Sequence, residues 1–144
     1  MIHSSISEII VQQEIVYDEL ARHNQIQNVK YQNIKYFMNT INGYVNNTPI
    51  DFLKAMDEMQ NLDHNFDDNF IGFVNERTQE CLQFIHKTKD DWYAEVVIGY
   101  GKKWEGYCWC ADSKTQKITD MIRLFFEEVP WFGMIQWKMR RFKH

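Results

Sequence analysis

The fold is decided by residues 70–110, which read FIGFVNERTQECLQFIHKTKDDWYAEVVIGYGKKWEGYCWC. From Phe70 the pattern changes from a helical period to a period of two, and short polar segments separate runs rich in aromatic and β-branched residues. Alternation with a period of two, rich in aromatic and β-branched residues, is typical of half-buried strands. Four strands are predicted, over Phe70–Glu76, Glu80–His86, Trp92–Ile98 and Trp104–Cys110. Because the connections between them are short, we expect consecutive strands to pair antiparallel.

Downstream of this stretch the pattern predicts a helix and one more strand. Asp112 or Ser113 is expected to cap the helix, and Pro130 is expected to end it. Its apolar face is predicted to consist of Ile118, Met121, Ile122, Phe125 and Phe126. Alternation resumes after Pro130, so a last strand is expected over Trp131–Phe142.

Upstream, apolar residues recur every three or four positions, which predicts three helices. The first carries a stripe made of Ile2, Ile6, Ile9, Val16 and Leu20. The second is predicted from Tyr31, Ile34, Met38, Ile41 and Val45. The third would begin with Thr48 as N-cap and Pro49 as first helical residue, and would bury Phe52, Leu53, Met56 and Met59.

These patterns predict an α+β fold in one domain spanning residues 1–144. Residues 1–62 would form the helical part, and residues 70–144 a roughly five-stranded antiparallel sheet with one helix inserted before the last strand. A chain of 144 residues is long enough for one sizeable core, and no Pro-, Gly- or Ser-rich linker divides it. The apolar stripe of the first helix would pack either within the chain or against a second copy in a homodimer.

Composition narrows the class of protein. The formal net charge of −4 argues against broad binding of nucleic acid, although the basic C-terminal end leaves a local contact open. We expect a cytoplasmic protein without a membrane segment, because no apolar run is long enough to span a bilayer and the first residues lack the features of a signal peptide. Three cysteines fit the reducing cytosol better than a disulfide scaffold.

Two polar clusters contain residue types that bind metals, but neither predicts a cofactor. Cys108 and Cys110 point to the same side of a predicted strand, and Cys81 or His86 is a conceivable further ligand for a soft metal or a redox pair. We expect buried structural thiols instead, because no second cysteine pair completes the site. The segment around Asp63 resembles a calcium loop but lacks the glycine and the final glutamate of that template.

The acidic segment, residues 51–68, is predicted to attract a basic protein partner. It carries six acids against the single base Lys54. Such a local charge steers association with an oppositely charged surface. The candidate partner-binding residues are Asp57, Glu58, Asp63, Asp67 and Asp68.

The richest feature is the set of aromatic rings, which make up 15% of the chain. Alternation assigns Trp92 and Trp104 to one sheet face together with Cys108, and Tyr107 and Trp109 to the other. Large rings left on a face must be covered by the N-terminal helices, by another protein or by a small ligand. The candidate ligand-binding residues are Trp104, Tyr107, Trp109 and Trp92.

No catalytic motif is present, so a non-enzymatic interaction or regulatory protein is the leading hypothesis. The alternative is a small-molecule-binding domain that uses an aromatic sheet face. An enzyme would need a cleft that unites Glu95, Glu105 or His86.

Overall fold

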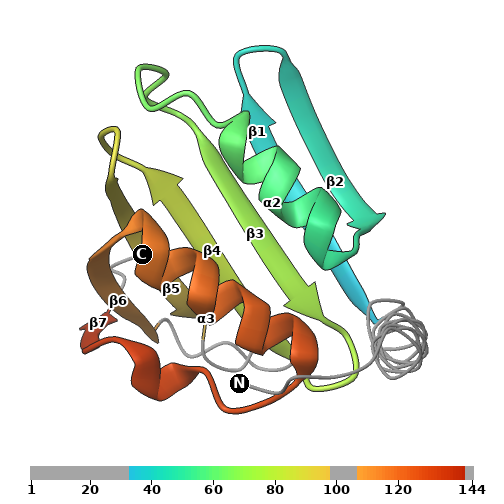
Figure 1. Ribbon diagram of the computed structural model, residues 1–144, viewed down its shortest axis with the longest axis vertical. Coiled ribbons are helices and arrows are strands. Elements are labelled where there is room, and N and C mark those ends of the chain that lie inside the picture. Colours follow the sequence, from blue (N-terminus) through green and yellow to red (C-terminus); the bar gives the residue numbers. More distant parts are fainter. Residues whose placement is uncertain (1–32, 98–106, 142–144) are drawn as a thin grey trace, which may run out of the picture.

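The computed structural model describes residues 33–97 and 107–141. Seven strands form one antiparallel sheet with the order β2-β1-β3-β4-β5-β6-β7, so that only the first hairpin departs from sequence order (Figure 1). The strands are β1 (Ile34–Thr40), β2 (Gly43–Pro49), β3 (Phe70–Asn75), β4 (Glu80–His86), β5 (Asp91–Val97), β6 (Tyr107–Lys114) and β7 (Lys138–Arg141). The helices within these described ranges are α2 (Phe52–Gln60), α3 (Thr115–Glu127) and the short 3-10 helix η1 (Phe132–Met134).

Helices α2 and α3 lie side by side on the same face of the sheet (Figure 1). The core fills the space between them and that face. Its largest fully buried side chains come from both layers and include Phe73, Phe84, Phe125, Phe126, Ile34, Ile71 and Leu82. The protein is therefore an α+β fold with an antiparallel sheet, as the alternation predicted. We call this side of the sheet the covered face.

The helix predicted from Tyr31 to Val45 is wrong, and so is the count of about five strands. The chain forms the β1–β2 hairpin there, with Thr40 paired with Gly43 across the turn. Ile34 and Met38 are spaced by four, which fits a helix, but the residue between them, Tyr36, is also buried, as a strand requires. The hairpin supplies the two strands that the prediction lacked.

The third predicted helix exists as α2, with a different start. Pro49 ends β2, and the N-cap is Asp51, whose carboxylate accepts a hydrogen bond of 2.8 Å from the backbone amide of Lys54. Leu53 was predicted to be buried and is 78% exposed. Ala55 is fully buried and is one of the α2 residues that pack into the core.

The strands predicted between Phe70 and Val97 are confirmed within one residue, and so is the buried face of α3. The predicted caps Asp112 and Ser113 are wrong, because β6 continues to Lys114. Asp90 satisfies the start of α3 instead. Both its carboxylate and its carbonyl oxygen accept from the backbone amide of Thr115.

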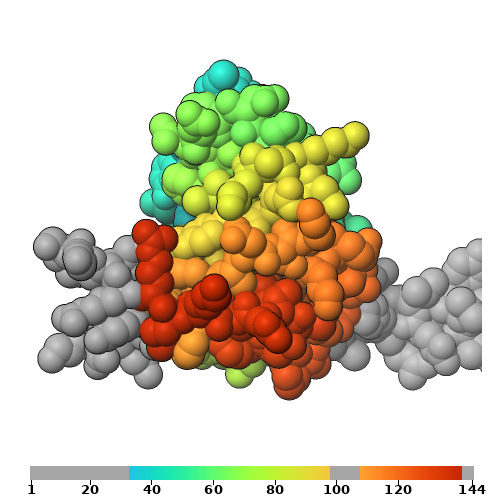
Figure 2. Space-filling model, turned by 90° about the vertical axis from the view of Figure 1, so that its left-hand side faces the viewer, coloured from blue at the N-terminus to red at the C-terminus, as the bar shows by residue number. Residues whose placement is uncertain are grey.

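The last strand is shorter than predicted. Trp131 is buried and η1 follows it, so that only β7 pairs with β6. In Figure 2, which views this end of the sheet, η1 and β7 (red) lie against β6 and α3 (orange). The indole Nε1 of Trp137 donates to the carbonyl oxygen of Phe132 at 2.6 Å, which closes the segment on itself.

The two outer strands of the sheet are both irregular. Strand β2 is largely exposed, ends at Pro49, contains Asn47 at a φ of 50°, and pairs with β1 through a bulge between Tyr36 and Met38. Strand β7 at the other edge has four residues and begins with a lysine.

The predicted first helix and its proposed dimer seam lie outside the described residues. Among the residues that are described, no helix is long and apolar enough to cross a membrane.

Candidate functional site

The sheet face turned away from α2 and α3, here called the opposite face, carries the candidate site. The pairing of neighbouring strands places one row of side chains across it. This row runs through Phe37, Gly72, Gln83, Glu95 and Cys110. It is aromatic at the β1 end and polar in the middle, and it has a thiol at the β6 end.

An aromatic pocket lies at the β1 end of this face. Gly72 is paired with Phe37, and a Cβ on Gly72 would collide with the Phe37 ring, so the ring lies directly on the glycine backbone. Phe70 packs against Phe37 with ring centroids 6.0 Å apart and against Tyr44 at 6.1 Å. The pocket has a volume of about 300 Å³ and is further lined by Gln83, Phe84, Ile85, Tyr93 and Glu95.

Glu95 is the acidic group of this pocket. Its side chain is half-buried, and its Oε2 accepts a hydrogen bond of 2.8 Å from Nε2 of Gln83 on the neighbouring strand. This contact fixes the carboxylate against the sheet. The charge lies close enough to Tyr93 to raise the pKa of that phenol, although burial is the larger cause.

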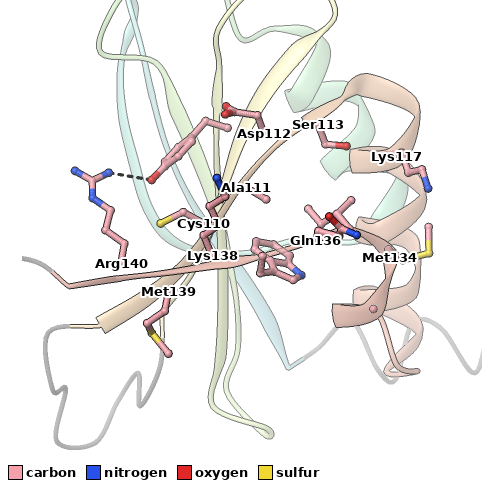
Figure 3. A pocket seen from close by; sticks show the side chains of 14 residues that line it. Cys110, Ala111, Asp112, Ser113, Lys117, Met134, Gln136, Lys138, Met139 and Arg140 are labelled. Atoms are coloured by element: carbon pink, nitrogen blue, oxygen red, sulfur yellow. Dashed lines mark hydrogen bonds between the residues drawn. The ribbon is translucent and has the colours of Figure 1, made fainter.

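Tyr93 links this pocket to a second, more open hollow at the β7 end. The guanidinium of Arg140 donates to the Tyr93 hydroxyl at 3.0 Å (Figure 3). The second hollow has a volume of about 960 Å³ and lies between β6, β7 and the segment around η1. Its lining includes Lys117, Lys138 and Arg140, so it is the more basic of the two hollows.

The three cysteines of the described residues, Cys81, Cys108 and Cys110, are buried on the opposite face. Burial raises the pKa of the Cys81 thiol to about 12, and that of Cys108 also to about 12. The Sγ atoms of Cys108 and Cys110 are 3.1 Å apart, and all three cysteines are free thiols. Within residues 33–97 and 107–141, no group of three or more His, Cys, Asp or Glu residues is placed to hold a metal ion.

The predicted aromatic residues do not form the pocket. Trp92 is 2% exposed, stacks on His86 at 4.0 Å, and donates from its indole Nε1 to the Thr115 hydroxyl at 2.9 Å. Trp109 is half-buried and packs edge-on against Phe132. Both indoles therefore belong to the covered side.

The predicted grouping of faces across strands is wrong. Trp109 pairs with Val96 and so shares a face with Trp92, whereas Cys108 pairs with Val97 and lies on the other face. Alternation fixes the two faces within a strand but leaves the register between strands open. Tyr107 lies in β6 opposite Arg141 in the backbone register, and Trp104 lies outside the described residues.

Of the five predicted partner-binding residues, one is buried and four are exposed. Glu58 is only 8% exposed and pairs with Lys54 one turn earlier at 2.9 Å, so it belongs to the helix surface rather than to an open acidic patch. The exposed members are Asp57, Asp63, Asp67 and Asp68. The Asp63 carboxylate accepts from the Asn65 amide at 2.9 Å and shapes the loop after α2.

The described residues do not bring together the side chains that an enzyme would need. Glu95 lies on the opposite face, while His86 lies on the covered face with its Nδ1 2.8 Å from the Leu62 carbonyl oxygen. The sheet separates the two side chains. Glu105 falls outside the described residues.

Sequence reasoning missed Phe37, Tyr44 and Phe70 as a group. The signal that could have found them is Asn42-Gly43, a dipeptide typical of hairpin turns. Gly43 has a φ of 127°, a conformation that residues with a Cβ rarely adopt. A hairpin at this position brings Tyr44 back beside the aromatic residues of β1 and β3.

Comparisons with protein-family models, with curated proteins and with solved structures gave no match. The geometry of the site is therefore the basis for the function proposed next.

Proposed function

We propose that this protein is a non-enzymatic binding protein whose opposite face takes a small organic molecule in the aromatic pocket. The observation that supports this proposal is the wall of three rings, Phe37, Tyr44 and Phe70, beside the fixed carboxylate of Glu95. Small-molecule sites are typically concave and apolar, with a few polar groups that orient the ligand. The pocket has this composition and a volume at the lower end of the usual range.

The close packing of Phe37 on Gly72 supports a preformed site. The ring has a fixed position because glycine leaves room for it and the two residues face each other across strands. A wall that is ordered before binding loses little conformational entropy when a ligand arrives. The bound molecule would therefore pack against a surface that already has its final shape.

The test is a fragment screen read out by backbone amide chemical shifts of the labelled full chain. Aromatic fragments should shift the amides of Phe70, Gly72 and Glu95 and leave those of α3 unchanged. Tryptophan fluorescence is a poor readout here, because Trp92 and Trp109 lie on the covered side.

A matched pair of surface variants separates binding from general effects. Tyr44→Ala removes a ring that is 56% exposed, so it should weaken fragment binding with little change in stability. Leu53→Ala removes an apolar side chain that is 78% exposed on α2, at the other side of the sheet, and should leave binding unchanged. Shifts confined to α2 and α3, or no shifts at all, would reject the proposal.

A protein partner for the acidic segment is the second candidate. Its support is that Asp63, Asp67 and Asp68 are all exposed in the connection between α2 and β3. Such a contact should weaken as salt rises, since exposed charges are screened. Capture of a basic partner that persists at high salt, or in the variant with all three aspartates changed to asparagine, would reject it.

A further inference from the structure

Glu95 differs from the ion-paired acids of the described chain because its charge has no cation bonded to it. Its Oε2 accepts from the neutral amide of Gln83, and no ion pair of the described residues includes it. No buried side-chain oxygen of the described residues lacks a hydrogen-bond partner, so solvent reaches the second oxygen, Oε1. A half-buried carboxylate with one accessible oxygen is well placed to accept from a ligand.

Arg140, a cation whose charge interacts with that of Glu95, is hydrogen-bonded to another group. Arg140 donates to the Tyr93 hydroxyl, and Glu95 acts on it only as a longer-range charge. Lys138 pairs with Cys110 in the backbone register, one strand beyond Glu95. Within the part of the chain that the structure describes, no lysine or arginine forms an ion pair with Glu95.

The aromatic rings beside Glu95 favour a positively charged ligand, as the Glu95 carboxylate does. The faces of aromatic rings carry negative potential and attract ammonium groups, an effect that grows when water is displaced. Phe37, Tyr44 and Phe70 form one wall of the pocket and Tyr93 lies at its other side. A cation would gain from both the carboxylate and the rings, a neutral molecule would gain from the rings alone, and an anion would be repelled by Glu95.

We propose that the ligand of the aromatic pocket is an organic cation, with an ammonium group at the Glu95 carboxylate and an apolar or aromatic body packed on Phe37 and Phe70. This inference rests on the proposed function and specifies its ligand class. The volume of about 300 Å³ suits a single ring with a short chain. The pocket thus selects by charge as well as by shape.

Three soluble probes with one ring and different charges test the inference. They are 2-phenylethylammonium, 2-phenylethanol and phenylacetate, titrated into the labelled protein while the amides of Phe70, Gly72 and Glu95 are followed. We expect the cation to bind about tenfold more tightly than the alcohol, a ratio typical of one charge-assisted hydrogen bond. Phenylacetate should bind more weakly than the alcohol.

Glu95→Gln is the decisive variant, because it removes the charge and keeps the size and the hydrogen bond to Gln83. It should abolish the preference, so that 2-phenylethylammonium and 2-phenylethanol bind the variant about equally well. Glu80→Gln is the control, since it removes one negative charge from β4 outside the pocket lining. In this control the preference should remain.

The outcomes separate the two proposals. Equal binding of the cation and the alcohol, or a preference that survives in Glu95→Gln, overturns the cation inference and leaves the proposed function intact. The same holds if neutral fragments occupy the pocket and the cation does not. If no fragment of any charge shifts the pocket amides, the proposed function fails and the inference fails with it.

Discussion

The two faces of the sheet are built from the same strands, yet they differ in what surrounds their side chains. On the covered face Phe73 is fully buried and packs edge-on against Phe126 of α3. Gly72, the residue before Phe73, lies on the opposite face. The half-buried Phe37 ring packs on its backbone, beside the polar side chains of Gln83 and Glu95. The covered face holds the buried core, whereas the opposite face carries the rings and the carboxylate on which the proposed function rests.

The largest expected effect is on the covered face. Phe73→Ala should lower the free energy of unfolding by about 3–5 kcal/mol, because it removes a fully buried ring and leaves a cavity. Phe37→Ala removes the same side chain from the opposite face and should cost about 1–2 kcal/mol, since that ring is only half-buried. Urea unfolding of both variants measures the difference. Equal losses would show that the two faces contribute alike.

The next effect concerns the contact between Gly72 and Phe37. Gly72→Ala should cost about 1–3 kcal/mol and weaken fragment binding, because the new Cβ must displace the Phe37 ring. The double variant with Phe37→Ala removes the clash, so it should be more stable than the sum of the single changes predicts. Denaturant unfolding of the full cycle measures this coupling. Strictly additive costs would contradict the close packing of ring and glycine.

A smaller effect is expected where the covered face ties β5 to α3. Trp92→Phe keeps an aromatic ring in the core but loses the hydrogen bond from the indole Nε1 to Thr115. We expect a loss of about 1 kcal/mol, typical of one intramolecular hydrogen bond. Thermal and urea unfolding measure it, with Thr115→Val as the partner change. A cost near zero in both variants would show that this bond contributes nothing.

The smallest effect at neutral pH, and one that grows in alkali, comes from the thiols of the opposite face. Burial raises the pKa of Cys81 from an ordinary 9.0 to about 12. Below pH 9 the thiol is protonated in both states, so it has no effect on the pH dependence. Between pH 9 and about 12 only the unfolded chain loses this proton, so stability should fall as pH rises.

The Cys81→Ala variant isolates this contribution. It should lose less stability than the unchanged protein between pH 9 and about 11, whatever its stability at pH 7. Unfolding curves across this range provide the measurement. Parallel curves for the two proteins would show that the Cys81 thiol does not titrate differently in the folded and unfolded chain.

The comparison of the two faces also explains what the sequence could predict. Strands β3 to β5 were predictable because short runs rich in aromatic and β-branched residues are separated by polar turn segments, and α3 because its five buried residues recur at helical spacing. The β1–β2 region was not, since Ile34 and Met38 fit a helix as well as a strand. Only the Asn42-Gly43 turn distinguishes the two patterns.

The candidate site was harder to predict than the fold. Its rings come from β1, β2 and β3, and they meet because of register and of space left by a glycine rather than because of any spacing along the chain. Tryptophans were predicted as ligand-binding residues because their rings are the largest. Trp92, however, is buried, and its large ring fills part of the core. The register of pairing between strands decides which aromatic residues meet on one face. This register cannot be read from a single sequence.

The irregular outer strands have a consequence for the behaviour of the protein at high concentration. Regular, flat edges offer unpaired backbone groups to other molecules and promote cross-β growth. Here Pro49 and the bulge near Tyr36 disturb one edge, while the short β7 with Lys138 limits the other. These features are ones that native sheets use to limit edge-to-edge pairing, so neither outer strand of the seven-stranded sheet offers a long, regular edge to a second molecule.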